Sequence, residues 1–196
     1  MNGPFVLVSY PPVSVPFMSK QRSLPQWVRD EMQALVQTMP GEIRLTADLP
    51  ELDQKLDTTL CFLRNDEFKT WLIEDITACV DWLSTVSNTR GFHIRLEAIT
   101  ERMCPKFHID RAPVRLLCSY FGSGTEWTDA DTAYSSNINE PYDPENIFQV
   151  PPEAILIFAG SQGASSLAPL WHRSPEVMPG ARRLLLCVDT ESHEIE

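Results

Sequence analysis

Hydrophobic residues in the first half of the chain recur at intervals of three and four, the period of an amphipathic helix. The strongest case runs from Asp66 to about Ser87, where Asp66 is expected to cap the helix start. The apolar positions there are Phe68, Trp71, Leu72, Cys79, Trp82, Leu83 and Val86. Aromatic residues at this spacing are typical of packing, so we expect this helix to support a sheet.

Two further helices are predicted earlier in the chain. "PQWVRDEMQALVQTM" at 25–39 follows Ser23, carries the same period and ends at Pro40-Gly41. "DLPELDQKLDTTLCFL" at 48–63 is the second. Residues 1–22 form a proline-rich lead-in, with an edge strand expected at Phe5–Val8.

After Gly91 the pattern changes to alternation, which predicts β-strands. "FHIRLEAIT" at 92–100 places Ile94, Leu96 and Ala98 on one side and Arg95, Glu97 and Ile99 on the other. Further strands are expected in "KFHID", "PVRLLCSYF", "EAILIFAG", "LAPLWHR" and "RRLLLCVD". Many short strands with turns between them indicate a sandwich or barrel.

Two connections stand out. "GSGTEW" at 122–127 predicts a turn and then a strand, with Gly122 and Gly124 at positive φ. Residues 128–152 are polar and proline-rich, which predicts a long loop of the kind that often closes over a ligand. With 196 residues, the chain is expected to form one α+β domain, with a mostly helical part at 1–90 and a β core at 91–190.

Charge and composition exclude several functions. Asp and Glu number 27 against 16 Lys and Arg, a net charge of −11, so binding to nucleic acid is not expected. The five cysteines are scattered and form no CxxC pair, which favours free thiols in a reducing cytoplasm over disulfides. The N-terminus does not resemble a signal peptide, and no apolar run is long enough to span a membrane.

Candidate chemistry centres on His108 and Asp110, which would share one face of an extended strand. A third ligand is needed for a metal, and the candidates are His93, His172 and His193. His172 follows an apolar strand and is therefore placed at a strand end. Two histidines and one carboxylate leave coordination positions open, as non-haem Fe(II) enzymes require.

An arginine near His172 fits the same chemistry. Arg182 comes ten residues after His172, where a turn at Val177–Gly180 returns the chain as a strand. Its planar guanidinium could hold a carboxylate through two hydrogen bonds. Arg183 is the rival, because a shift of one residue exchanges the two faces of a strand.

The order of His-x-Asp, the strand "PEAILIFAG", a distal His and a following Arg resembles the Fe(II)/2-oxoglutarate-dependent dioxygenases. The resemblance covers residues 92–189 and implies a double-stranded β-helix, or jelly roll, with helices packed outside. It implies that His108, Asp110 and His172 bind Fe(II) and that Arg182 binds the C5 carboxylate of 2-oxoglutarate. Tyr120 or Tyr134 would share that carboxylate. The substrate, whether a small molecule or a protein, is not implied.

"CPKFHID", "RLLCSYFGSGTEW" and "HRSP…RRLLL" resemble a bacterial family labelled as a domain of unknown function. Its members are often encoded beside zinc-homeostasis genes, which implies a connection with metal. The alternative function is therefore a non-catalytic zinc-binding protein in bacterial metal homeostasis, in which Cys104 joins the three ligands around Zn(II). An inert thiol at Cys104 is the simpler interpretation.

The surroundings of the site are also predicted. Arg115 and Ser119 share a strand face and could line the cavity beside the metal. Trp127 either borders the pocket or fills the core. A hydrolase with a Ser–His–Asp triad is not indicated, because the chain lacks GxSxG at a strand-to-helix turn.

Overall fold

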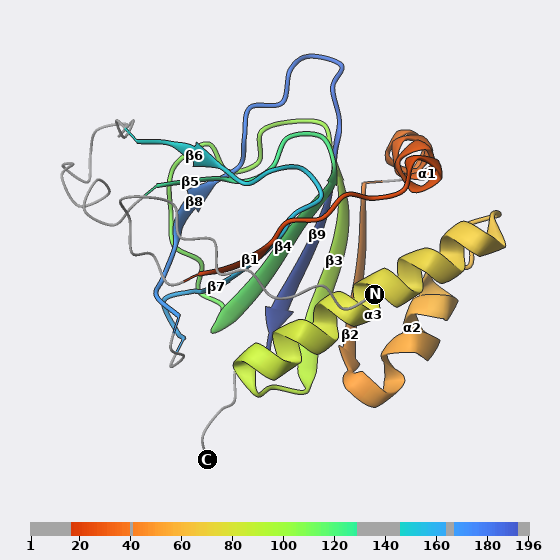
Figure 1. The fold of residues 1–196 in the computed structure, drawn as a ribbon, viewed down its shortest axis with the longest axis horizontal. Helices are drawn as coiled ribbons and strands as arrows, with labels where there is room; N and C mark the ends of the chain where they lie inside the picture. Colours follow the sequence, from red (N-terminus) through yellow and green to blue (C-terminus); the bar gives the residue numbers. More distant parts are fainter. Residues whose placement is uncertain (1–16, 40, 129–145, 164–166, 192–196) are drawn as a thin grey trace.

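The fold combines two antiparallel sheets with helices on one side (Figure 1). The structure is a computed structural model that describes residues 17–39, 41–128, 146–163 and 167–191. In these ranges a six-stranded sheet has the order β1-β7-β4-β9-β3-β2, and a three-stranded sheet has the order β6-β5-β8. No helix of the described residues is long and apolar enough to cross a membrane.

The bounds of the elements follow the chain. The helices are α1 (Gln26–Thr38), the short 3-10 helix η1 (Leu49–Glu51), α2 (Leu52–Thr59) and α3 (Asp66–Ser87). The strands are β1 (Met18–Lys20), β2 (Glu42–Asp48), β3 (Gly91–Ile99), β4 (Val114–Phe121), β5 (Glu126–Thr128), β6 (Phe148–Gln149), β7 (Ile155–Ala159), β8 (Trp171–Arg173) and β9 (Arg183–Thr190).

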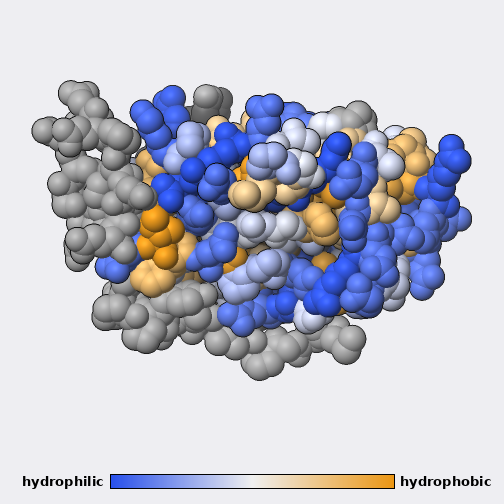
Figure 2. All heavy atoms as spheres, turned by 90° about the horizontal axis from the view of Figure 1, so that it is seen from above, coloured by the Kyte–Doolittle hydropathy of each residue, from blue (hydrophilic) through white to orange (hydrophobic). Residues whose placement is uncertain are grey.

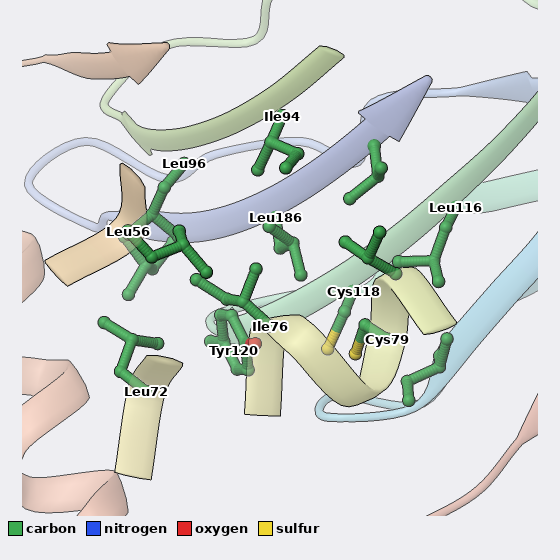
Figure 3. Packing of buried hydrophobic residues seen from close by; sticks show 14 of the residues in the cluster. Leu56, Leu72, Ile76, Cys79, Ile94, Leu96, Leu116, Cys118, Tyr120 and Leu186 are labelled. Carbon is green, nitrogen blue, oxygen red and sulfur yellow. The ribbon is translucent and has the colours of Figure 1, made fainter. Parts of the chain in front are cut away.

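One face of the large sheet is covered by the helices. The alternation predicted for β3 is confirmed: Ile94 and Leu96 point into this layer, together with Leu116 of β4 and Leu186 of β9. Figure 3 shows these side chains packed against Leu72, Ile76 and Cys79 of α3 and Leu56 of α2. The three predicted helices are confirmed, and their apolar faces close this core.

The start of α3 differs from the prediction in one detail. Its N-cap is Asn65 rather than Asp66, because the Asn65 side chain accepts a hydrogen bond from the Phe68 amide at 3.2 Å. Asp66 is the first helical residue, where its charge still favours the helix N-terminus.

The opposite face of the large sheet packs against the small sheet in a second core. Leu156 and Phe158 of β7 and Cys187 of β9 contribute to it, and Trp127 of β5 is buried there with 1% of its surface exposed. The ring of Trp127 stacks on Phe148 of β6, with 4.5 Å between ring centroids. The predicted loop at 128–152 therefore contains a strand at its end, while residues 129–145 lie outside the described ranges.

Three sequence predictions need correction. "KFHID" forms only an isolated bridge at His108, not a strand. Gly122 has φ +82°, but Gly124 does not have positive φ; glycine is needed at 124 because a Cβ would lie 1.8 Å from the Val150 carbonyl oxygen. The part before residue 91 is not helical throughout, since β2 pairs with β3 along its length. The edge strand expected at Phe5–Val8 lies outside the described residues.

Hydrophilic residues predominate on the face of the molecule seen in Figure 2, where hydrophobic residues form small separate groups. This surface agrees with an acidic chain of net charge −11.

Candidate metal centre

His108 and His172 lie opposite each other in an antiparallel bridge. The amide of each donates to the carbonyl oxygen of the other at 3.0 Å, which fixes the two backbones side by side. Because directly opposed residues project to the same side, the two rings meet, with centroids 4.6 Å apart. His172 is buried in β8, and His108 is about one-third exposed.

Asp110 completes the cluster from the loop before β4. Its carbonyl oxygen accepts a hydrogen bond from the Ser161 amide at 2.7 Å, and Gly160 permits this close approach, since a Cβ there would lie 2.6 Å from the same oxygen. The carboxylate Oδ1 lies 3.5 Å from Nε2 of His108, and Oδ2 lies 3.1 Å from Nε2 of His172. One potential ligand atom from each of the three residues lies within 4.8 Å of the others.

The hydrogen bonds of the rings set their tautomers. Nδ1 of His108 is 3.0 Å from the Lys106 carbonyl oxygen, and Nδ1 of His172 is 3.0 Å from that of Leu170. A carbonyl only accepts, so Nδ1 carries the proton in both rings and Nε2 presents a lone pair. Metal-binding histidines are commonly oriented by such a bond. Two lone pairs and a carboxylate thus face one another, an arrangement that a cation stabilises.

The electrostatics of Asp110 agree with a cation site. Burial would raise its pKa, but hydrogen bonds from His108 and His172 and the charge of Arg115 hold the pKa well below its usual range. The hydrogen bond to Asp110 raises the pKa of His108 above its usual value, against the effect of burial. Oδ2 of Asp110 is buried without a well-aligned hydrogen bond, although ion-pair partners are near. The donor set therefore fits a divalent metal.

The cluster opens into a cavity of about 180 Å³ between the two sheets. Arg183 lines this cavity with only 2% of its surface exposed. Its guanidinium donates to Oγ of Ser119 at 2.9 Å and to Oγ1 of Thr125 at 2.9 Å, and among the described residues it forms no ion pair. Burial lowers the pKa of Arg183 to about 10, so its charge is held in the cavity at a cost.

Arg182 does not line the cavity, contrary to the first of the two expectations. It points to the helical side, where Nη1 donates to the Val36 carbonyl oxygen at 3.2 Å. The register of β9 is the reason: Leu185 and Cys187 face the cavity, so Arg183 shares their side.

Arg115 also lines the cavity, as predicted, and links the cluster to the sheet. Its Nη1 lies 2.6 Å from Oδ2 of Asp110, while Nε and Nη2 contact the carboxylate of Asp189 at 2.5 and 2.7 Å. The network continues through Arg95, which lies 3.7 Å from Asp189 and 2.9 Å from Glu97. The sequence analysis missed Asp189 as part of the site, although it alternates with Cys187 on the cavity face of β9.

The other expected pocket residues lie elsewhere or contribute differently. Tyr120 is on the helical face, where its hydroxyl donates to Oδ2 of Asp75 at 2.6 Å, so it does not reach the cavity. Trp127 belongs to the core and does not line the cavity. Cys104 is exposed at the cavity wall but is not in the ligand group, because no strand aligns it with His108.

Two other predicted residues fall outside the described ranges, namely Tyr134 and His193. The remaining candidate ligand, His93, is exposed on β3, with Nδ1 3.0 Å from Oγ1 of Thr46, and is not in the ligand group either.

The family described as "Protein of unknown function (DUF1826)" matches residues 7–189. The chain belongs to the DUF1826 family. This confirms the predicted membership of a domain-of-unknown-function family. A comparison with curated proteins gave no match.

Solved structures similar to this DUF1826 protein include a prolyl-4-hydroxylase from Pseudomonas putida, with 11% identity and a TM-score of 0.49 over 92% of this chain and 89% of the other. A protein from Caulobacter crescentus assigned to the 2OG-Fe(II) oxygenase family has 14% identity and a TM-score of 0.48, over 90% and 77%. A C-terminally truncated protein from Neurospora crassa has 11% identity and a TM-score of 0.44 over 64% of this chain, which spans 52% of the Neurospora chain.

Proposed function

We propose that this DUF1826 protein is an Fe(II)/2-oxoglutarate-dependent dioxygenase and that its two facing sheets are a double-stranded β-helix. The observation that carries the proposal is the pairing of two features in one cavity. The first is the cluster of His108, Asp110 and His172. The second is Arg183, a buried cation whose partners among the described residues are uncharged hydroxyls.

The three ligands have the composition that this chemistry needs. Two neutral imidazoles and one carboxylate bind Fe(II) with a net charge of +1 and leave coordination positions for other molecules. Bound Fe(II) would supply the activation of dioxygen, with 2-oxoglutarate as the second electron source. The backbone bonds at Nδ1 of both histidines keep Nε2 free of a proton, so the ligands are ready to bind at neutral pH.

Arg183 is the proposed anchor for the far carboxylate of 2-oxoglutarate. A buried guanidinium without a counter-ion is costly, and a carboxylate ligand restores the missing charge partner. The hydroxyls of Ser119 and Thr125 hold the guanidinium plane in place before the ligand arrives. They take the supporting place that the sequence analysis gave to Tyr120.

The walls of the cavity serve the same chemistry. Leu117, Leu185 and Ile99 line it with apolar surface, which displaces water and strengthens the ion pair between Arg183 and a carboxylate. The protein thus orients both ligands of the reaction and limits the access of water.

The proposal is tested by incubating the purified protein with Fe(II), ascorbate and 2-oxoglutarate and measuring succinate. Turnover of 2-oxoglutarate without a substrate is expected, together with its loss in Asp110→Asn. Asp81→Asn on the exposed side of α3 is the matched control, because it removes the same charge far from the cavity. A single bound zinc, no succinate and no effect of 2-oxoglutarate on metal affinity would favour the zinc-binding alternative.

A further inference from the structure

A second hollow lies beside the metal cavity on the large sheet. It has a volume of about 650 Å³, and we call it the outer groove. Its polar lining consists of Arg44, Thr46, His93, Arg95, Arg115 and Asp189. Arg95 and Arg115 also line the metal cavity, so the two spaces share a wall.

The register of β2 and β3 arranges charges in an unusual way. Arg44 pairs directly with Arg95 across the strands, and Glu42 pairs directly with Glu97. Like charges directly opposite each other destabilise a sheet, and a shift of partners would have avoided both pairs. A rule of strand pairing that is broken twice in one place suggests a functional constraint.

The arginines are neutralised only within their own strands. Arg44 bonds to the carboxylate of Glu42, two residues earlier, and Arg95 contacts Glu97, two residues later, at 2.9 Å. The result is a row of arginines beside a row of glutamates. Of these four side chains, the two arginines line the outer groove.

The ion pair of Arg44 is weak enough to be replaced. The side chain of Arg44 is 64% exposed and that of Glu42 is 33% exposed, and such surface pairs contribute little to stability. An incoming anion can therefore take over the guanidinium without a large loss. Three arginines against one carboxylate make the lining locally positive on a chain whose net charge is −11.

We propose that the outer groove binds an anionic group of the substrate, a carboxylate or a phosphate, between Arg44 and Arg95. The part of the substrate to be oxidised then passes Arg95 and Arg115 to reach the metal. Guanidinium groups favour both anions because they offer two parallel donors to a pair of oxygens. This inference rests on the proposed dioxygenase function and names the substrate class for that site.

The test follows the arginine Nε–H signals by ¹H–¹⁵N NMR while inorganic phosphate or acetate is added to the metal-free protein. The signals of Arg44 and Arg95 are expected to shift with a common affinity, and the tighter of the two probes identifies the anion. Arg44→Gln is expected to weaken this affinity about tenfold. Arg64→Gln, which removes an exposed arginine between α2 and α3, is the matched control and should leave it unchanged.

Three results overturn the inference. They are the absence of a shift at Arg44 and Arg95 with both probes, an equal loss of affinity in the two variants, or a response confined to Arg183. Arg44→Lys is expected to bind more weakly than the unmodified protein and more tightly than Arg44→Gln, since it keeps the charge without the fork.

The same preparation separates this inference from the proposed function. Anion binding at Arg44 and Arg95 without any metal binding overturns the dioxygenase proposal and with it the assignment of the anion to a substrate. Metal binding and succinate formation without anion binding at these arginines overturn the outer-groove inference alone.

Discussion

His108 and His172 exchange two backbone hydrogen bonds, each 3.0 Å long, so the bridge that joins their segments also brings their rings together. The metal cluster is thus built on a β-bridge rather than on a loop alone. Asp110 is tied separately, through its carbonyl oxygen, to the Ser161 amide. A site held in this way is preorganised, and the removal of one side chain should leave the others in place.

This arrangement predicts the response of metal affinity to His172→Ala. We expect the affinity for Co(II), a spectroscopic substitute for Fe(II), to fall by more than the roughly 100-fold that loss of a supporting hydrogen bond can cost. His93→Ala is the control, because His93 is exposed on β3 outside the cluster. Titration followed by visible absorption measures both. Equal affinities in the two variants would show that His172 is not a ligand.

Arg183 and Arg182 provide a matched pair for the second prediction. Both changes to Gln remove one positive charge at adjacent positions, but only residue 183 lines the cavity. We expect Arg183→Gln to raise the KM for 2-oxoglutarate about 100-fold, because a charge-assisted pair with a carboxylate is lost in a buried site. Arg182→Gln should change it less than about twofold.

Initial rates of succinate formation at varied 2-oxoglutarate concentration give these constants. If Arg182→Gln had the larger effect, the assignment of the anchor to Arg183 would be wrong.

The third prediction concerns Arg115, which is held between Asp110 and Asp189. Arg115→Met leaves two carboxylates without this partner, and we expect the free energy of unfolding of the metal-free protein to fall by about 3 kcal/mol. Metal binding gives Asp110 a new counter-ion, so the difference between variant and unmodified protein should shrink when Zn(II) is present. Denaturant unfolding with and without Zn(II) measures both values. A loss that metal does not reduce would mean that Arg115 serves only Asp189.

The sequence predicted the helices and most strands because their apolar periods are long and regular. It also predicted which residues could form the cluster, since His108 and Asp110 are close in the chain and His172 follows an apolar strand. The bridge between His108 and His172 could not be predicted, because a single pair of residues leaves no periodic signal.

The choice between Arg182 and Arg183 shows the same limit at finer scale. The faces of β9 alternate residue by residue, and Leu184 and Leu185 are both apolar, so the pattern does not say which side meets the cavity. The case of Tyr120 is different. Arg115 and Ser119 were assigned to the cavity face, and a residue at an even position between the same strand ends falls on the opposite face, so its exclusion was available from the alternation.

The last prediction concerns stability at low pH and Glu153, which joins the N-terminal segment to the residue before β7. The Glu153 carboxylate accepts a hydrogen bond from the Leu24 amide at 2.8 Å and pairs with Arg29 at 2.5 Å, although the residue has a positive φ of 67°. Burial would raise its pKa, but these bonds outweigh burial and lower the pKa below the usual value.

A carboxylate with a lowered pKa in the folded state adds stability above its unfolded pKa, and this contribution is lost as the pH falls through the folded value. Glu153→Gln should therefore cost about 2 kcal/mol at neutral pH and progressively less as the pH falls below about 4. Glu101→Gln, at an exposed position after β3, is the control and should change stability by less than about 0.5 kcal/mol. Urea unfolding at several pH values measures the difference, and a cost that stays constant down to the acid range would show that the charge of Glu153 does not hold the segment in place.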